Sequence, residues 1–207
     1  MSFYPELDDL NLQDLITRFR QPRHDIYLMY PDEVDLYYAE VAWVITQQGD
    51  EGGKFLLDEV RDADTARLRG ILSALAFRKF DRLDLSGLFL SHLSDRRPII
   101  VMEAIDGLSG QEVREALGKV LPLFNHESPY VRGSVLRYMR RLYPNESFAL
   151  LVTALKDPHN IVRDNAIDEL DELNNPEALP FLYLLLDDPH PDTRQAAQTA
   201  IKNLKDA

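Results

Sequence analysis

The sequence predicts an all-α fold in which helix pairs stack side by side into a solenoid. Two observations support this class: one turn signature recurs at a fixed spacing, and apolar residues recur at helical spacing between the turns. The signature reads HESPYVR, DPHNIVR and DPHPDTR, and its closing arginines stand at positions 132, 163 and 194, so 31 residues separate each from the next. A period of this size is typical of stacked units that cannot bury their apolar faces alone.

The unit that starts at Asp157 shows why each element should be helical. Asp157 and Pro158 are expected to open the first helix as its N-cap and first residue. A break is predicted at Asn174 to Glu177. Two apolar stripes at helical spacing define the paired helices: Val162, Ala166, Leu170 and Leu173 in the first, and Leu179, Leu182, Tyr183 and Leu186 in the second.

The same columns recur in both directions along the chain. We therefore expect about five helix pairs and one continuous core in a single domain, residues 1–207. Residues 1–30 form a capping segment with a helix at Leu10 to Arg20, residues 31–187 hold the repeats from about Pro31, and residues 188–207 form a final half-repeat. First helices are expected to begin near Pro98, Pro129, Pro158 and Pro189.

Composition restricts the compartment and the partner. The chain has no cysteine, which excludes disulfides and thiolate metal sites. Apolar runs are too short to span a bilayer, and the acidic start MSFYPELDDL lacks the order of a secretion signal. We expect a cytoplasmic protein that does not contact a membrane. Its net charge of −12, from 35 acidic and 23 basic residues, argues against a nucleic-acid partner.

The last full unit carries a family resemblance. The run NPEALPFL from Asn175, the run LLDDP from Leu185 and the run RQAA from Arg194 resemble the short HEAT-type repeat, in the subclass named after phycobilin lyase subunits. The likeness is clear over Ser128 to Lys205 and fainter over Pro31 to Asn125. It implies a right-handed α-α superhelix. The chain departs from the family where LDELN, from Leu170, replaces the usual Leu-Gly pattern.

A column of arginines, Arg69, Arg132, Arg163 and Arg194, has two interpretations. It could bind an acidic ligand, or each arginine could pair with an acidic group of a neighbouring unit. The available aspartates are Asp95, Asp157 and Asp188. The resemblance favours the second interpretation, because short HEAT units use this Asp and Arg for packing. Arg163 is accordingly predicted to be paired and partly buried.

No catalytic residue, metal ligand or cofactor site is predicted. Histidines one repeat apart, such as His159 and His190, would lie about 10 Å from each other, too far to share an ion. The stretch Gly49 to Lys54 lacks the Ser or Thr and the preceding strand of a phosphate loop, so an inter-helix turn is expected there. The acidic residues Asp164 to Glu172 are expected to form a solvated helix face.

Outward-facing charges alternate in sign from one unit to the next. One column at the 31-residue period reads Asp106, Arg137, Asp168, Thr199, and the next reads Arg140, Asp171, Lys202. These charges could form inter-repeat ion pairs, a patterned binding surface, or both. We expect a non-catalytic protein-binding scaffold that uses the concave face of the solenoid, with partner-binding residues Asp106, Arg137, Arg140, Asp168 and Asp171 and an unidentified protein as partner.

Two alternatives follow from the resemblance. Some short HEAT proteins are subunits of phycobilin lyases, which would require a groove for a bilin chromophore. A HEAT-like DNA glycosylase would require a basic groove, which the acidic residues interrupt. The aromatic-rich N-terminal third, with Tyr27, Tyr30, Tyr37, Tyr38 and Trp43, could cover the open end of the stack or contact a partner, and capping is favoured.

Overall fold

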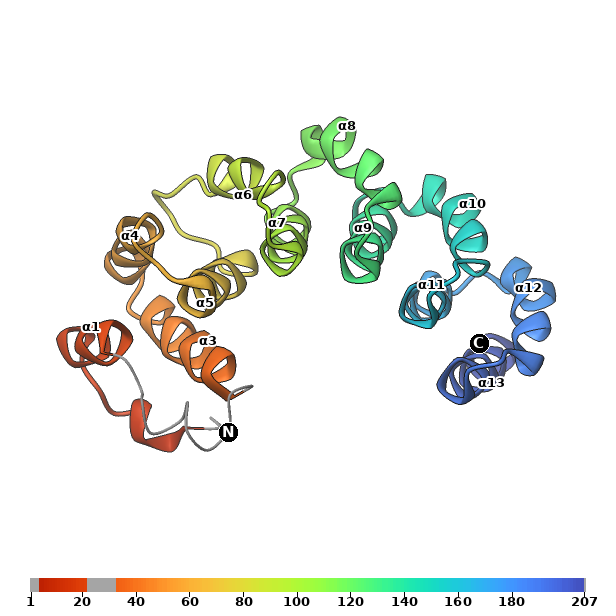
Figure 1. The fold of residues 1–207 in the computed structure, drawn as a ribbon, viewed down its shortest axis with the longest axis horizontal. Coiled ribbons are helices and arrows are strands. Elements are labelled where there is room, and N and C mark those ends of the chain that lie inside the picture. Colours follow the sequence, from red (N-terminus) through yellow and green to blue (C-terminus); the bar gives the residue numbers. More distant parts are fainter. Residues whose placement is uncertain (1–3, 22–32, 207) are drawn as a thin grey trace. The chain divides into compact units, whose positions relative to one another are not determined.

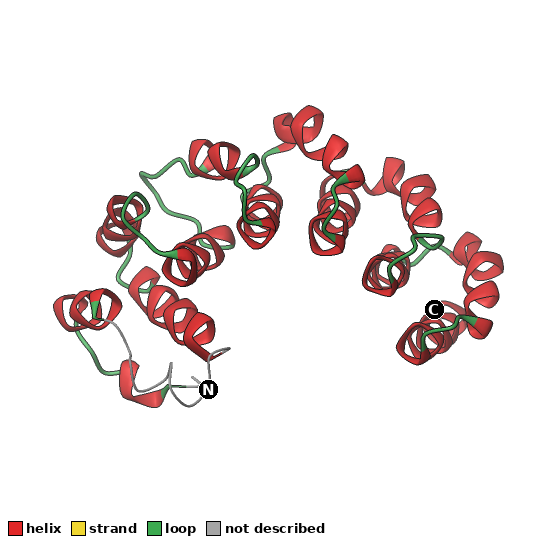
Figure 2. Cartoon of the chain, in the orientation of Figure 1, coloured by secondary structure: helices red, strands yellow, loops and turns green. Residues whose placement is uncertain are grey.

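The structure, a computed structural model, describes residues 4–21 and 33–206. Every regular element in these two ranges is a helix (Figures 1 and 2). The all-helical class expected from the sequence is confirmed. Close contacts divide the chain into two compact units, Met1–Val113 and Arg114–Ala207, hereafter unit 1 and unit 2. That both share one continuous core in a single domain stays a prediction.

The described part of unit 1 consists of helices of seven to fourteen residues and a short 3-10 turn. They are η1 (Pro5–Leu7), α1 (Leu12–Arg20), α3 (Glu33–Thr46), α4 (Asp50–Glu59), α5 (Thr65–Ala76), α6 (Ser86–His92) and α7 (Pro98–Gly110). Helices α3, α5 and α7 pack one against the next, while α1 packs on α3 and α6 on α7. The predicted N-terminal helix is confirmed as α1, whose N-cap Asn11 accepts a hydrogen bond from the Asp14 backbone N–H at 3.0 Å.

Unit 2 alternates long helices with shorter, broken ones. Its elements are η2 (Arg114–Ala116), α8 (Leu117–Val120), η3 (Leu121–Asn125), α9 (Pro129–Leu142), α10 (Pro144–Ala154), α11 (Asn160–Leu173), η4 (Pro176–Ala178), α12 (Leu179–Tyr183), η5 (Leu184–Asp187) and α13 (Pro191–Asp206). Helices α9, α11 and α13 pack in succession and form what we call the odd row. The remaining elements form the even row, which covers one side of the odd row (Figure 1).

The core of unit 2 lies between the two rows. It contains most of the predicted apolar columns: Val162, Ala166 and Leu170 of α11 are inaccessible to solvent, as are Leu182 of α12 and Ala197 of α13. The prediction is wrong for Tyr183, which is 41% exposed because it lies on the outer side of α12 beside Leu184. Burying each large aliphatic side chain contributes about 1.5–3 kcal/mol, so the 31-residue period follows directly from the need to cover these stripes.

Two helices of the odd row begin later than the sequence predicts. Pro158 and Pro189 were expected near their first positions, yet α11 begins at Asn160 and α13 at Pro191. The reason is a tight turn. The carboxylate of Asp157 accepts the backbone N–H of His159, and that of Asp188 accepts the N–H of His190, each at 2.9 Å. The aspartates therefore close a turn ahead of the helix rather than cap the helix itself.

The turn expected from Gly49 to Lys54 is also wrong in extent. Helix α4 begins at Asp50, and only Gly49 adopts the left-handed conformation, with φ of 71°. Gly52 lies inside α4, where an added Cβ would stand 2.0 Å from the carbonyl oxygen of Ile45 on α3. This glycine permits close packing of two helices and does not form a turn.

The aromatic residues of unit 1 divide between core and surface. Tyr37 and Tyr38 on α3 are fully buried, and the ring of Tyr38 meets that of Phe19 on α1 edge-on at 5.8 Å. Trp43 on α3 is exposed. Packing is therefore confirmed for the two buried tyrosines, whereas Tyr27, Tyr30 and Pro31 lie outside the described residues.

Candidate functional site

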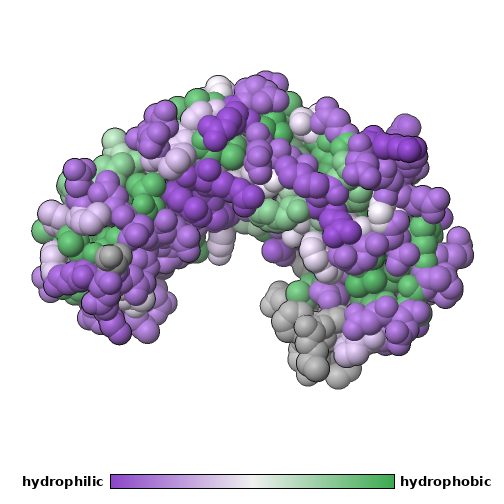
Figure 3. All heavy atoms as spheres, turned by 180° about the vertical axis from the view of Figure 1, so that it is seen from behind, coloured by the Kyte–Doolittle hydropathy of each residue, from purple (hydrophilic) through white to green (hydrophobic). Residues whose placement is uncertain are grey.

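The odd row of unit 2 carries four of the five predicted partner-binding residues. Arg137 and Arg140 lie three residues apart on α9, and Asp168 and Asp171 lie three apart on α11, so each pair shares one helix face. Asp106 lies on α7 in unit 1, where it is partly exposed. Hydrophilic side chains dominate the surface of unit 2 in the space-filling view, with smaller apolar patches between them (Figure 3).

The charges on this face make inter-repeat contacts, but not in the expected register. Arg140 Nε donates to Glu169 Oε2 at 2.6 Å rather than to Asp171. Arg137 Nη1 donates to Asn165 Oδ1 at 2.7 Å. Asp171 in turn accepts a hydrogen bond from Asn203 Nδ2 at 2.7 Å.

Side-chain direction explains the register. A helical side chain leans toward the N-terminus of its own helix. Arg140 on α9 therefore meets a residue of α11 two positions before its 31-residue equivalent, and Asn203 on α13 reaches one position back on α11. Glu169, Asn165 and Asn203 were missed because a comparison of equivalent positions ignores this lean.

Helix α11 carries a concentration of negative charge around Asp168. Partial burial of its carboxyl group, followed by the charges of Glu169 and Asp164 and then of Asp171 and Glu172, raises the pKa of Asp168 above its usual value. Asp164 accepts a hydrogen bond from the Thr193 hydroxyl, and Arg140 binds Glu169. Within the described ranges, no side chain donates a hydrogen bond to Asp168 itself.

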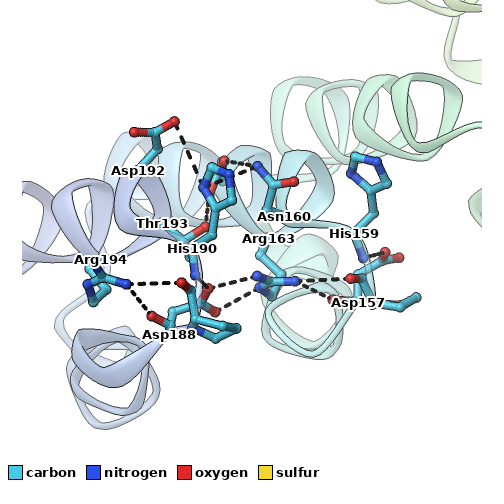
Figure 4. Close-up of polar contacts among 12 residues, drawn as sticks. Asp157, His159, Asn160, Arg163, Asp188, His190, Asp192, Thr193 and Arg194 are labelled. Carbon is cyan, nitrogen blue, oxygen red and sulfur yellow. Dashed lines mark hydrogen bonds and ion pairs between the residues drawn. The ribbon is translucent and has the colours of Figure 1, made fainter.

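A second polar system, which we call the arginine ladder, links the turns of unit 2. It consists of Arg132, Arg163 and Arg194 with Asp157 and Asp188. Arg163 is only 8% exposed and grips both oxygens of Asp188, from Nε at 2.8 Å and Nη2 at 2.7 Å (Figure 4). Its Nη1 donates backwards to the carbonyl oxygen of Asp157 at 2.9 Å. One guanidinium thereby ties its own turn to the next one.

Arg132 repeats this geometry one unit earlier. Its Nε and Nη2 donate to Asp157 at 2.9 and 2.7 Å, and its Nη1 donates to the carbonyl oxygen of His126 at 2.8 Å. Burial alone would raise the pKa values of Asp157 and Asp188. The hydrogen bonds from Arg132 and Arg163, with those from the turn N–H groups, outweigh burial and lower both pKa values. The prediction that Arg163 is paired and at least partly buried is confirmed.

The ladder does not extend to the earlier members of the predicted columns. Arg69 in unit 1 does pair with an acidic group of the neighbouring repeat, as predicted, but that group is Glu103 of α7, at 3.1 Å, and not an aspartate of a turn. Asp95 binds Arg97 of its own turn, with the shortest contact at 2.8 Å, and this ion pair lowers the pKa of Asp95 to about 2 despite partial burial. The expected pairing of Asp95 with an arginine of a neighbouring unit is therefore wrong.

The turn histidines stabilise the backbone. His159 is the N-cap of α11, where its Nδ1 accepts the Ile161 N–H at 3.3 Å, and His126 Nδ1 accepts the Ser128 N–H at 3.0 Å. Among the side chains that the structure describes, no three of His, Cys, Asp or Glu are grouped as a metal ion requires. Nor does this part of the chain contain a helix long and apolar enough to cross a membrane.

Two open grooves lie in unit 2. One, of about 560 Å³, borders the Arg132–Asp157 pair, whose charges already neutralise each other. The other, of about 570 Å³, is mainly apolar and lies between α8, η3 and α10, with Leu121 and Tyr143 on its walls. The Tyr143 hydroxyl donates to the carbonyl oxygen of Arg114 at 2.6 Å, which fixes the ring at the edge of this groove.

Comparisons with known proteins agree with this repeat architecture. The family model described as HEAT repeats matches residues 115–202. The structure of an engineered protein superposes with a TM-score of 0.58 at 14% identity, covering 95% of this chain and 98% of that one. A designed armadillo repeat protein in complex with the peptide (KR)4 superposes with a TM-score of 0.54 at 16% identity, covering 94% of this chain and all of that one. No curated protein matches the chain.

The described part of the chain is thus an all-helical repeat fold, similar to HEAT and armadillo repeat solenoids. In particular, residues 115–202, nearly all of unit 2, are similar to HEAT repeats. The matches support the HEAT repeat as such and not the phycobilin lyase subclass that the sequence resembles.

Proposed function

We propose that this chain is a non-catalytic protein-binding scaffold and that its partner binds the polar face of the odd row. In unit 2 the binding residues are Arg137 and Arg140 on α9 and Asp168 and Asp171 on α11; Asp106, on α7 of unit 1, is a separate candidate. The partner contributes a basic segment, which lies against α11.

The observation that carries this proposal is the electrostatic environment of Asp168. The negative charge of Asp168 is unfavourable beside four other carboxylates and in its partly buried position, and the pKa of Asp168 is accordingly raised. The buried stripe of α11 faces the opposite way and does not require acidic residues here. A lysine or arginine from a partner would relieve the repulsion, so this unfavourable charge in the free protein favours binding of a cation.

The fold and the net charge support the same partner class. The designed armadillo repeat protein, whose fold is similar, was solved with the basic peptide (KR)4. A net charge of −12 attracts a cationic segment and accelerates its association at low ionic strength. Arg137 and Arg140 restrict where that segment can lie, because each would repel a cation placed over α9.

A labelled (KR)4 peptide provides the test, with fluorescence anisotropy as the readout. We expect the wild-type protein to bind it, and the double variant Asp168→Lys, Asp171→Lys to lose most of the binding while its helical circular dichroism is retained. The matched control is Asp8→Lys, Asp9→Lys, which changes the net charge equally on exposed residues of unit 1. If both double variants lost the same amount of peptide binding, the effect would be due to net charge alone, and the proposed site on α11 would be refuted.

A further inference from the structure

The last arginine of the ladder is held like the other two but differs in what it binds. Arg194 Nη1 donates to the carbonyl oxygens of Asp188 at 2.7 Å and Pro189 at 3.1 Å, as Arg163 does to the preceding turn (Figure 4). In Arg132 and Arg163, the Nε and Nη2 groups clasp an aspartate. Among the described residues, no carboxylate meets the Nε and Nη2 groups of Arg194.

We propose that this Nε–Nη2 edge of Arg194 is a docking site for an aspartate of a partner protein, presented on an Asp-Pro turn. Two Asp-Pro turns of this protein are bound by an arginine in the way that we propose for the partner's turn. Asp157 and Asp188 each precede a proline, close a turn with the N–H two residues on, and offer both oxygens to an arginine at 2.7–2.9 Å.

The geometry of the Arg194 guanidinium favours a carboxylate that a short side chain holds on a rigid turn. A guanidinium edge and a carboxylate form two parallel charge-assisted hydrogen bonds. The two carbonyl oxygens that bind Nη1 fix the plane of the Arg194 guanidinium before the occupant arrives, which lowers the entropic cost of binding. The Asp-Pro turn fixes the carboxylate on the other side in the same way.

A neighbouring residue of α13 indicates that the occupant is polar. Leu136 of α9 and Ile167 of α11 occupy one column at the 31-residue period, and both are fully buried in the core of unit 2. The corresponding residue of α13 is Gln198, which is exposed. A further repeat would place an apolar face against this glutamine, whereas a polar turn would not. The site therefore fits a turn on a protein surface better than another stacked helix pair.

A second copy of this chain is a poor candidate for the occupant. Its own Asp-Pro turns are those of Asp157 and Asp188, whose carboxylates are already bound by Arg132 and Arg163. The side chains of these aspartates are only 9% and 4% exposed. The partner is consequently a different protein, and this surface is separate from the proposed binding face of the odd row.

The test uses a peptide that copies residues 155–161, Leu-Lys-Asp-Pro-His-Asn-Ile, titrated into the ¹⁵N-labelled protein. We expect the Nε–Hε resonance of Arg194 to shift and saturate, while that of Arg163, which is occupied, does not move. A peptide with asparagine at the aspartate should bind at least about ten-fold more weakly, since it loses a charged hydrogen-bond acceptor. The variant Arg194→Lys, which keeps the charge without the fork, should show the same loss.

Three results would overturn the proposal. The first is an Arg194 resonance unchanged at millimolar peptide. The second is equal binding of the aspartate and asparagine peptides, a comparison that does not depend on any protein variant folding. The third is an Arg194 resonance that moves with protein concentration alone, because self-association would then fill the fork instead of a partner's turn.

Discussion

Replacing Arg163 by alanine should be among the most damaging single changes in unit 2. Arg163 makes two hydrogen bonds to the Asp188 carboxylate and two to backbone carbonyls. Its loss would leave Asp188, whose side chain is 4% exposed, as a buried charge without its cation. Removing one partner of a buried ion pair typically costs about 3–5 kcal/mol.

Arg194→Ala is the matched control, because it removes the same side chain from the same helix position. Arg194 contributes the two carbonyl hydrogen bonds but grips no described carboxylate. We expect a cost of about 1 kcal/mol. Urea unfolding followed by circular dichroism, with both variants compared at pH 7, should therefore separate them by about 2 kcal/mol or more in the free energy of unfolding.

Acid should reduce the difference between the two variants. Burial opposes ionisation of Asp188, but Arg163 and the turn N–H outweigh it, so the folded-state pKa lies below the ordinary value of 3.8. The ion pair therefore stabilises the fold above that pH, and this contribution is lost as the pH falls through the folded-state pKa. Equal costs for Arg163→Ala and Arg194→Ala at pH 7 would refute the reasoning, and so would a difference that does not shrink in acid.

Four further outcomes are expected. Asp168→Asn should raise the thermal midpoint at pH 7, because the raised pKa means that the fold disfavours the charged form; melts near pH 3.8, where this penalty fades, should show a smaller gain. Gly110→Ala should lower the free energy of unfolding by about 1–3 kcal/mol, since its Cβ would stand 2.2 Å from the Ala76 carbonyl oxygen, whereas Gly118→Ala, with open space around it, should not. Gln111→Leu should speed hydrogen exchange at the end of α5, because the two N–H groups of the Gln111 amide are shared among three backbone carbonyl oxygens, at 2.9–3.0 Å, in the last turn of α5 and just after it. A gel-shift assay at physiological salt should detect no DNA binding, and tight binding would contradict the argument from net charge.

The sequence predicts the packing of this protein better than its polar contacts. The columns through Val162 and Leu170 repeat because every unit must bury the same stripe, and the structure buries them. The pairing of Arg163 with Asp188 was likewise visible, since both recur at the same period. Contacts such as that of Arg140 with Glu169 could not be predicted in the same way, because their register depends on how far a long side chain leans along its helix.

Local signals fail where one residue type serves two purposes. Gly52 lies in a glycine-rich stretch of the kind that usually forms a turn. A glycine is needed there because α3 packs closely against it, and no neighbouring residue in the sequence reveals that contact. Asp157 resembles a helix cap, and its carboxylate closes a turn and binds an arginine instead. Both errors come from tertiary contacts that override a local preference.

The arginine ladder also determines how unit 2 can deform. Asp157 is held through its carboxylate by Arg132 and through its carbonyl by Arg163, so successive turns are joined by short directional bonds that break before they stretch. Across the even row the contacts are of the kind made by Phe148 and Phe181, whose ring centroids lie 6.3 Å apart, and such apolar contacts can slide. Under load we expect the distances between successive turns to stay constant, while the distances between neighbouring elements of the even row increase or decrease.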